Sequence, residues 1–523
     1  MSPNRPLSFP LRQMARASAL TLVLTAGLLA SGCAVGPNFK RPAPPQTTTY
    51  SPKPMPDTTA SAPAVAAGDP ERFVMGRDIP FAWWKAFHSP KLDALVDKAL
   101  ASNPSLPAAI AALKQAHEQT AAQRGYFYPT IGADFQPTRQ QLAGNAGGNA
   151  PGIQGNGFDI TTNQTPNGPP FNMPIVYNFY TAQVGLSYTI DVFGQNRRQV
   201  ESLKAQEQAM RFQMEATYIT LTTNVVSAAI QEASLESEIK ATKAYITEAQ
   251  EGLDILKAQY ANGYVMRLDL ANQEAALAQA KALLPPLQKQ LEQTHDLIRA
   301  LVGGLPSDDV DMTFDMDDLT LPKDLPVSLP VNLINQRPDV RAAEEQLHSA
   351  NAQVGVAIAN RLPQFTVSAA YGGVASEVSQ LFAPGGPFWN LIGDASATVF
   401  DGGTLQHRQR AAEQGLVQAR AQYKQTLITA FQNVADTLHA IQSDADGLAA
   451  AAEAETAAKV ALDVTDRQYQ LGYCNYLALL QARQTYEQAE IVRIAAQTNR
   501  FGDAATLFQA LGGGWWNRTT GQS

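Results

Sequence analysis

The sequence predicts a mainly α-helical protein that also carries four short amphipathic β-strands and repeats one plan twice. Three observations support this prediction. Two stretches, 195–262 and 404–471, are each 68 residues long without a proline. Four shorter segments alternate apolar and polar residues with the period of two that is typical of strands. From Gly194 and Gly403 onward, equivalent residues of the two halves lie a constant 209 positions apart.

The first 32 residues have the pattern of a signal peptide. A basic start is followed by an uncharged run over 17–30 that is too short to cross a bilayer as a helix. Small residues precede Cys33 as in a bacterial lipobox, although Ala30 stands where a leucine is usual. We therefore expect cleavage before Cys33, attachment of lipid such as palmitate to Cys33, and a lipidated extended segment over 33–80.

Charge and cysteine content narrow the possible functions. The chain has 39 Lys and Arg against 47 Asp and Glu, and it shows no basic patch of the kind that binds nucleic acid. Removal of the signal peptide deletes three Arg and no acids, so the net charge of −8 becomes −8 − 3 = −11. The two cysteines are Cys33 and Cys474, so lipidation of Cys33 leaves no pair for an internal disulfide.

The first structural repeat is expected over 81–310. It contains, in order, a helix, a strand hairpin (128–191) and a long helical hairpin (195–303). A Gly/Asn/Pro-rich loop at about 139–176 separates the two strands. Gly263 supplies the turn of the helical hairpin, because glycine tolerates the positive φ of a helix end. The pair Pro285-Pro286 is expected to kink or interrupt the returning helix.

The second structural repeat is expected over 337–511, after a linker or equatorial segment at 311–336. It contains a helix, a strand hairpin (364–400) and a helical hairpin (404–511), and a C-terminal tail follows (512–523). The pairs Gly194 and Gly403, Gly263 and Gly472, and Leu268 and Leu477 are each 209 positions apart. This offset indicates an internal duplication.

The four strands have the pattern of a membrane barrel with a wet lumen. Four strands cannot close a barrel, since the smallest have about eight, and open sheet edges in lipid would leave backbone groups unpaired at several kcal/mol each. Copies of the chain must therefore complete the wall. Two copies would give about eight strands and a filled barrel, and three would give about twelve and a wider lumen. The long helices carry too many charges for lipid and must project from it, which predicts a duct.

Several motifs give the mature chain a family resemblance. They are Cys33-Ala34-Val35-Gly36-Pro37, Trp83-Trp84 with Phe87, Arg337-Pro338-Asp339-Val340-Arg341, Phe400-Asp401-Gly402-Gly403, two Tyr-x-x-Gly turns and Ala510-Leu511-Gly512-Gly513-Gly514-Trp515. With the duplication, they make the chain resemble the TolC-like outer-membrane efflux proteins, in their lipoprotein (NodT/OprM-like) branch.

This resemblance implies an architecture and a set of partners. The expected assembly is a homotrimer with a twelve-strand β-barrel, a twelve-helix periplasmic α-barrel and a mixed α/β equatorial domain. It would be lipid-anchored in the cell outer membrane with a large periplasmic portion. The implied partners are a periplasmic adaptor (membrane fusion protein) and an inner-membrane RND-type transporter, which supplies the energy for a passive exit duct.

The resemblance also implies a periplasmic gate where the second helical hairpin turns upward. The matching positions are Leu477, Gln481 and Gln484, with Asp269 of the first hairpin as a further candidate. Relatives often carry an acid and a base at the second and third of these positions, where this chain has two glutamines. We therefore expect closure to rest on Leu477 and amide hydrogen bonds rather than on an ionic latch.

The hairpin tips are the expected contact with the adaptor, through Gly263, Gly472 and Leu268. Each candidate has a plainer structural alternative. The two glycines are turn residues in any case, Asp269 fits a solvated helix surface, and Leu477 fits packing between helices. Cys474 is expected to be a free thiol without a task.

The sequence does not indicate an enzyme. It has no Walker loop, no G-x-S-x-G elbow and no spaced metal-ligand cluster, so we expect no catalytic residue, cofactor or metal. The expected function is the outer-membrane channel of a tripartite efflux pump for small molecules. A close alternative is the exit duct of a type I protein-secretion system. A different class is a non-conducting structural lipoprotein, against which the four alternating strands argue.

Overall fold

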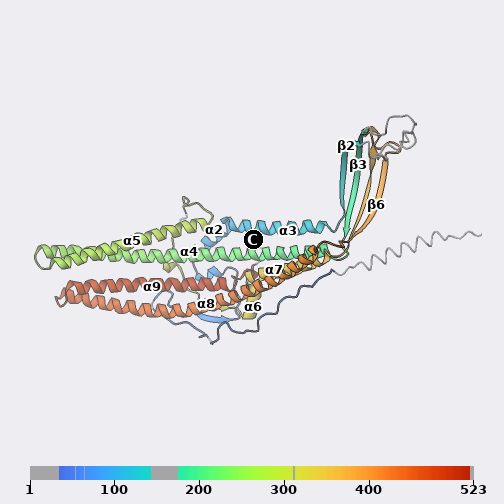
Figure 1. Cartoon of the computed structure of the whole chain (residues 1–523). Helices are drawn as coiled ribbons and strands as arrows, with labels where there is room; N and C mark the ends of the chain where they lie inside the picture. The colour runs from blue at the N-terminus through green and yellow to red at the C-terminus, as the bar shows by residue number, and fades with distance from the viewer. Residues whose placement is uncertain (1–33, 54, 64, 143–174, 310–312, 519–523) are drawn as a thin grey trace, which may run out of the picture. The chain divides into compact units, whose positions relative to one another are not determined.

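The computed structural model describes residues 34–53, 55–63, 65–142, 175–309 and 313–518 (Figure 1). The signal peptide expected over 1–32 and the lipid-attachment residue Cys33 lie outside the described residues. The chain divides into two compact units. The first comprises the described parts of Met1–Lys40, His117–Ala205 and His348–Gln418, and the second comprises those of Arg41–Ala116, Gln206–Leu347 and Ala419–Ser523.

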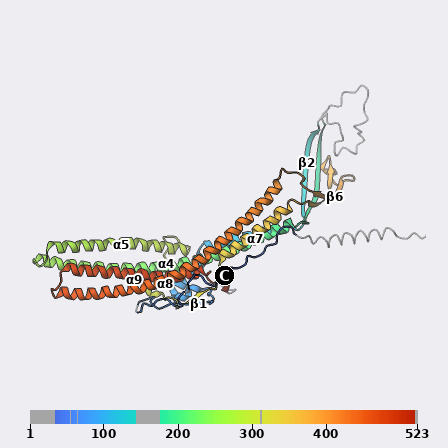
Figure 2. The same cartoon turned by 60° about the horizontal axis from the view of Figure 1, so that its bottom comes forward.

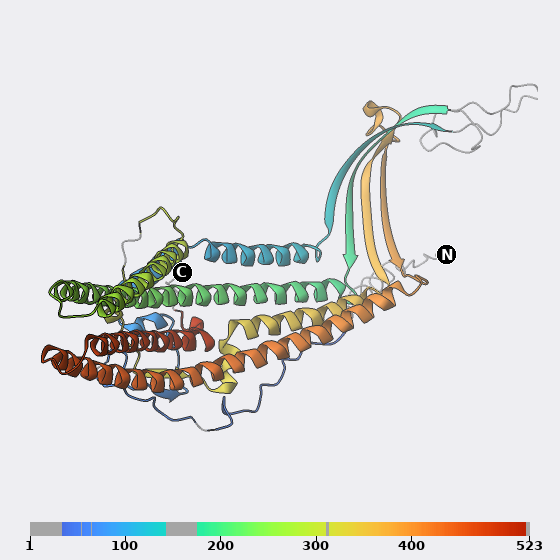
Figure 3. The same cartoon turned by 60° about the vertical axis from the view of Figure 1, so that its left-hand side comes forward.

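The first unit is built on an antiparallel sheet. Across the described residues its strands are, in spatial order, β2 (Thr130–Leu142), β3 (Ile175–Ile190), β5 (Gln364–Ala375) and β6 (Pro387–Ser396). Each strand pairs with its neighbour, and the two hairpins join through β3 and β5. Figure 3 shows the four strands side by side in a curved sheet. The duplicated hairpins thus share one sheet.

The strand limits differ from those that the sequence pattern predicts. The pattern places a loop over 139–176, whereas β2 continues to Leu142 and β3 begins at Ile175. It also places the last strand over 394–399, whereas β6 begins at Pro387 and ends at Ser396. Two adjacent apolar residues, Leu391 and Ile392, break the alternation there. The strand is defined by its pairing with β5. The sequence of β6 has no regular alternation of apolar and polar residues that would predict it.

Two helical hairpins provide most of the second unit. Helix α4 (Gln195–Ala261) returns as α5 (Arg267–Leu301), and α8 (Thr404–Gln470) returns as α9 (Tyr476–Ala510). Both outgoing helices have 67 residues and both returning helices have 35, so the duplication is preserved helix by helix. Figures 1 and 2 show the hairpins side by side. No helix in the described ranges has an apolar stretch long enough to cross a membrane.

Helix α5 passes through Pro285 and Pro286 without interruption, although the sequence predicts a kink or a break there. Each proline removes one backbone hydrogen bond. Side-chain packing offsets this loss, because Leu284 and Leu287 flank the pair and contact a buried cluster. That cluster consists of Leu235, Ile239 and Leu291.

A short parallel pair of strands in the second unit has no counterpart in the sequence prediction. Strands β1 (Arg72–Met75) and β4 (Asp324–Val327) pair with Phe73 opposite Leu325. Next to β1, the buried side chains of Arg500 and Glu71 form an ion pair at 2.8 Å. Burial raises the pKa of Glu71 to about 7, against the opposing effect of Arg500. The pairing of β1 with β4, which lie far apart in the sequence, therefore gives regular structure to part of the N-terminal segment. The composition of that segment alone indicates an irregular chain.

The main core of the second unit contains the tryptophan motif. Trp83 and Trp84 lie in a short 3-10 helix, η1 (Trp83–Phe87), and both are buried. The Trp83 ring stacks on Phe508 of α9 with ring centroids 5.2 Å apart. Helix α2 (Pro90–Ser102) and parts of α4, α8 and α9 complete this core.

The Arg-Pro-Asp motif joins two helices of the second unit. Arg337 lies between α6 (Pro330–Gln336) and α7 (Pro338–Ala359). Its Nη1 donates to the Ala510 carbonyl at 2.8 Å, and its Nη2 pairs with Asp339 Oδ2 at 2.6 Å. The motif therefore fixes the start of α7 against the end of α9.

Two polar side chains of α4, Glu232 and Thr242, are fully buried. Glu232 Oε1 contacts His295 Nε2 of α5 at 3.1 Å. Burial raises the pKa of this carboxyl, although His295 acts in the opposite direction. Glu232 thus makes a polar contact between the two helices of one hairpin.

Gly252 is the one glycine of α4, and it lies where the two hairpins approach closely. A Cβ at this position would be 2.5 Å from the hydroxyl of Tyr476. We expect Gly252→Ala to lower the thermal unfolding midpoint in detergent, because overpacking costs about 1–3 kcal/mol. Gly447→Ala in α8 is the matched control, since a Cβ there has no neighbour within 4 Å in the described residues.

A second substitution at the same contact should restore the stability that Gly252→Ala loses. The Tyr476 hydroxyl is buried without a hydrogen-bond partner among the described residues, so Tyr476→Phe removes the clash at little loss. The double variant should recover the wild-type midpoint, measured by circular dichroism. Equal midpoints for Gly252→Ala and Gly447→Ala would refute this packing.

Candidate functional site

The sheet of the first unit has one apolar and one polar face. Opposite residues in an antiparallel pair lie on the same face. One row across the four strands consists of Ala133, Val184, Tyr371 and Trp389. The row two positions away on that face consists of Ile131, Leu186, Ala369 and Leu391. The opposite face carries Asp134, Gln183, Gly372 and Phe388 in register, so it is more polar on β2 and β3 than on β6.

The apolar face is uncovered in a single chain. Trp389 is 76% exposed and Leu391 is 68% exposed. Among the described residues, the outer edges of β2 and β6 pair with no further strand. Such a sheet is a template for pairing with another chain, and its apolar face suits lipid better than water.

The two helical hairpins end in the same turn. The backbone hydrogen bonds run from Gly263 to Tyr260 (3.0 Å), Tyr264 to Gln259 (2.9 Å), Gly472 to Tyr469 (3.0 Å) and Tyr473 to Gln468 (2.8 Å). Each pair of bonds is a Schellman motif, which requires a positive φ at the glycine. The φ angles are 77° for Gly263 and 79° for Gly472. The Tyr-x-x-Gly sequence therefore encodes both tips.

The returning helices start with complementary halves of a capping box. In α5 the Asp269 carboxylate accepts a hydrogen bond from the Met266 amide at 3.2 Å. In α9 the Asn475 side chain accepts one from the Ala478 amide at 3.0 Å. A full box would contain both contacts, and each repeat keeps one of them. Asp269, a gate candidate from the sequence, thus has a capping role within its own hairpin.

The tips present aromatic and apolar side chains. Tyr264 and Tyr473, which follow the turn glycines, are 80% and 81% exposed. Leu268 is also exposed. A Cβ on either turn glycine would have no neighbour within 4 Å in the described residues, so both tips are accessible in one chain. The sequence pattern indicates Gly263, Gly472 and Leu268 as contact residues but does not mark the two tyrosines that follow the glycines.

The other gate candidates lie along the first turns of α9. Leu477, Gln481 and Gln484 are all exposed in the single chain. Arg483, which precedes Gln484, donates through Nη1 to the Glu248 carbonyl at 3.4 Å. The structure therefore leaves all three candidates available to another chain.

A buried carboxyl follows the gate candidates on α9. Glu487 is 7% exposed, and its Oε1 has no hydrogen-bond partner among the described residues. Burial, with the nearby acids Glu490 and Glu248 acting in the same direction, raises the pKa of Glu487 to about 7. The sequence gives no sign of this site, because an acid in an Ala/Gln-rich helix is equally typical of a solvated surface.

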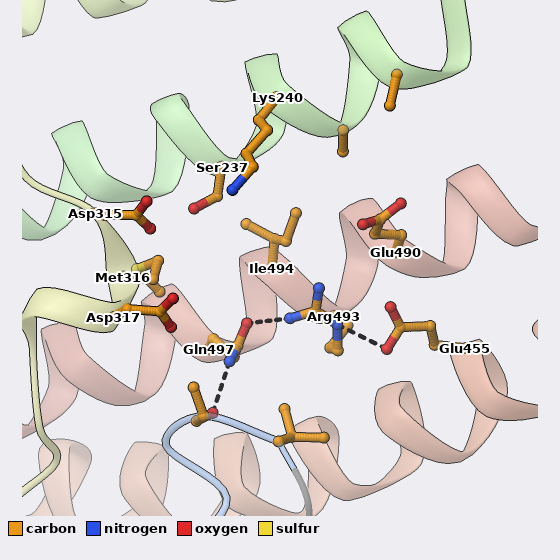
Figure 4. A pocket seen from close by; sticks show the side chains of 14 residues that line it. Ser237, Lys240, Asp315, Met316, Asp317, Glu455, Glu490, Arg493, Ile494 and Gln497 are labelled. Atoms are coloured by element: carbon orange, nitrogen blue, oxygen red, sulfur yellow. Dashed lines mark hydrogen bonds and ion pairs between the residues drawn. The ribbon is translucent and has the colours of Figure 1, made fainter. Parts of the chain in front are cut away.

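A polar cavity of about 510 Å³ lies between α4, α8, α9 and the segment around Ala66 (Figure 4). Arg493 Nε pairs with Glu455 Oε2 at 2.7 Å, and Gln497 Nε2 donates to the Ala66 carbonyl at 2.7 Å. Arg493 also donates to Gln497. These contacts join three segments of the chain, so Arg493, Glu455 and Gln497 serve packing.

The last side chain that the sequence singles out is Cys474. Cys474 is a free, half-buried cysteine whose thiol approaches the Thr465 carbonyl at 3.6 Å. Within the described ranges, no group of His, Cys, Asp or Glu is arranged to hold a metal ion.

A family model matches both halves of the chain. The model described as "Outer membrane efflux protein" matches residues 95–304 and 329–513, which together make up most of the sequence. The two matched stretches contain the two helical hairpins and both strand hairpins.

Individual relatives and one solved structure agree with this match. The pyoverdine export outer membrane protein OpmQ of Pseudomonas putida is 28% identical over 435 residues, which is 83% of this chain and 88% of that protein. The toluene efflux pump outer membrane protein TtgC of the same species is 26% identical over 512 residues, or 96% of each. The Campylobacter jejuni CmeC outer membrane channel superposes with a TM-score of 0.78 at 21% identity, over 92% of this chain and 95% of that chain, which shows a shared fold.

Glu487 makes stability depend on pH. Its pKa rises from 4.5 to about 7 on folding, so between these values the unfolded chain is ionised and the folded chain binds a proton. This contribution to stability is present below pH 4.5 and is lost as the pH rises to about 7. Glu487→Gln should therefore unfold at a higher temperature than wild type at pH 8, with a smaller difference at pH 5.

The matched control is Glu453→Gln, an exposed acid on α8, which should leave the pH dependence of the unfolding midpoint unchanged. A Glu487→Gln variant whose midpoint falls in parallel with wild type between pH 5 and pH 8 would contradict a buried protonated carboxyl.

Proposed function

The chain belongs to the outer membrane efflux protein family, and we propose that three copies form the passive exit duct of a tripartite pump. Membership makes it an outer-membrane efflux protein, and the family is one of channels rather than of enzymes. The single observation that carries the proposed trimer is the four-stranded sheet with two unpaired edges and an exposed apolar face.

The proposed wall is a twelve-strand barrel, with four strands from each copy. The edge of β6 in one copy would pair with β2 of the next, because both edges have free backbone groups. Rows such as Tyr371 and Trp389 would face lipid, and Asp134 and Gln183 would face the lumen. The helical hairpins of three copies would form the twelve-helix periplasmic part, and the collar would come from the segments around β1, β4 and η1.

The proposed gate uses Leu477, Gln481 and Gln484. Support comes from the exposure of all three side chains in the single chain. The capping contact of Asp269 makes that residue a support of the tip rather than a first choice for an ionic link.

The proposed docking surface for the periplasmic adaptor is the pair of tips at Gly263 and Gly472, with Leu268. Exposed aromatic side chains are frequent anchors in protein interfaces, which favours including Tyr264 and Tyr473. An RND-type inner-membrane transporter is the proposed energy source. Lipid attachment at Cys33 would hold the mature chain, after removal of residues 1–32, at the outer membrane.

Experiments can distinguish two other functions from the proposed one. The exit duct of a type I protein-secretion system has the same architecture, whereas the family description favours efflux. A non-conducting spacer lipoprotein would have no use for the sheet, whose exposed apolar face and polar opposite face are typical of a channel wall.

We expect the purified, detergent-solubilised protein to insert into a planar lipid bilayer and to conduct ions. The reason is that a closed barrel of about twelve strands leaves a water-filled lumen. The measurement is single-channel current at several voltages. A protein that binds bilayers without producing discrete current steps would support the spacer and contradict the duct.

We expect Leu477→Ala and Gln481→Ala channels to show a larger single-channel conductance or a higher open probability than wild type. Smaller side chains would widen a constriction at this level. Leu268→Ala is the matched control, because Leu268 occupies the equivalent position of the first hairpin, 209 residues earlier. Conductance equal to wild type in both gate variants would remove these residues from the gate.

A further inference from the structure

The first residues after Cys33 are held by one buried arginine of α4 in the first unit. Arg198 is only 4% exposed. Its guanidinium donates to the carbonyl oxygens of Val35 (3.0 Å), Gly36 (3.2 Å) and Ala34 (3.4 Å), and to Asn38 Oδ1 (2.8 Å). Because three of the four acceptors are backbone oxygens, Arg198 binds mainly the backbone of the segment, with one contact to the Asn38 side chain.

A second layer of contacts holds Arg198 and the segment in place. Arg198 Nη1 pairs with Glu201 Oε2 at 2.7 Å, and Glu201 Oε1 contacts His348 Nε2 at 3.0 Å. The ring of Phe39 stacks on His348 with centroids 4.3 Å apart. Burial acts to raise the pKa of Glu201, but hydrogen bonds from Arg198 and His348 lower it overall. Glu201 therefore stays ionised beside the guanidinium.

The backbone itself fits closely against the helices. Gly36 has a φ of 90°, and a Cβ there would be 2.6 Å from the Cα of Gly355 in α7. A Cβ on Gly194 would be 2.6 Å from the Cα of Ala34. Asn351 adds a hydrogen bond to the Pro37 carbonyl at 2.9 Å. Glycines at 36, 194 and 355 thus permit a backbone-to-backbone fit that larger residues would prevent.

This site lies next to the end of a strand of the sheet. The Val35 amide donates to the carbonyl of Phe193 at 3.0 Å, and strand β3 ends three residues earlier, at Ile190. Cys33 is covalently bonded to Ala34. Because Ala34 is held in place, an acyl group attached to Cys33 can occupy only a small region around it. A tether that short gives the acyl chains a high effective concentration at one place on the sheet.

We propose that Arg198 is a positioning residue, and that its binding of residues 34–38 directs the lipid anchor to the end of β3. This inference rests on the proposed lipid attachment at Cys33. The anchor would then hold the sheet at the bilayer surface while copies meet and strands insert. The site would speed assembly of the duct and would leave its conductance, once assembled, unchanged.

The first experiment compares Arg198→Ala with the control Arg408→Ala, which removes an exposed arginine from α8 of the same unit. Hydrogen exchange of the Val35 amide, which donates to the Phe193 carbonyl, should accelerate at least about tenfold in Arg198→Ala and remain unchanged in the control. Unchanged exchange in Arg198→Ala would overturn the proposal. If Arg198→Ala fails to fold, Asn351→Ala takes its place, and it should loosen the segment to a smaller degree.

The second experiment tests whether the site acts through the lipid. Cells expressing each variant in a pulse would be sampled over time for cross-linked trimer in the outer membrane. We expect Arg198→Ala to slow trimer formation several-fold in the acylated chain and to add nothing in a Cys33→Ala background. A slowing of equal size in both backgrounds would show a merely structural role and overturn the proposal, as would no slowing in the acylated chain.

Two further measurements test the proposed function independently of the role of Arg198. Mass spectrometry of the mature N-terminal peptide reports acylation directly, and bilayer recordings on assembled Arg198→Ala trimers report conduction. Trimers of this variant that conduct like wild type support the positioning role. An acylated wild-type trimer that does not conduct would reject the duct without affecting the exchange and assembly results.

Discussion

The structure depends on one constraint, the unpaired edges of a four-stranded sheet with an uncovered apolar face. Backbone groups at a sheet edge are satisfied by water or by another strand, and lipid supplies neither. A chain that places β2 and β6 at the edges and residues such as Trp389 on the surface needs neighbours of the same kind. The proposed trimer is the smallest set of copies that closes the sheet and leaves a wide lumen.

The duplication explains how one chain supplies equal parts to such an assembly. The hairpin helices of the two repeats have identical lengths, and both tips use the same turn. The repeats differ where function is proposed. Met266 and Asn475 are equivalent positions, yet one helix start is capped through Asp269 and the other through Asn475 itself. The second hairpin alone carries the buried Glu487 close to the gate candidates.

The absence of proline and the position of the turn glycines were enough to predict the long helices. Helices α4 and α8 follow from 68-residue stretches without proline, and Gly263 and Gly472 mark their ends. Strands β1 and β4 could not be predicted, because four-residue strands have no measurable period and depend on a partner far along the chain. The same holds for the Arg500–Glu71 pair and for the site around Arg198, where residues 160 or more positions apart meet. Helix α5 continues through Pro285 and Pro286 because side-chain packing outweighs the tendency of proline to interrupt a helix.

The most direct test of this account is the mass of the protein in detergent, measured by native mass spectrometry on the intact complex. The account predicts a single species of three chains, in which the strand edges of each copy are paired with those of the next. A stable monomer that stays in aqueous solution without detergent would contradict it, because an unsealed sheet with this apolar face would then need no neighbours.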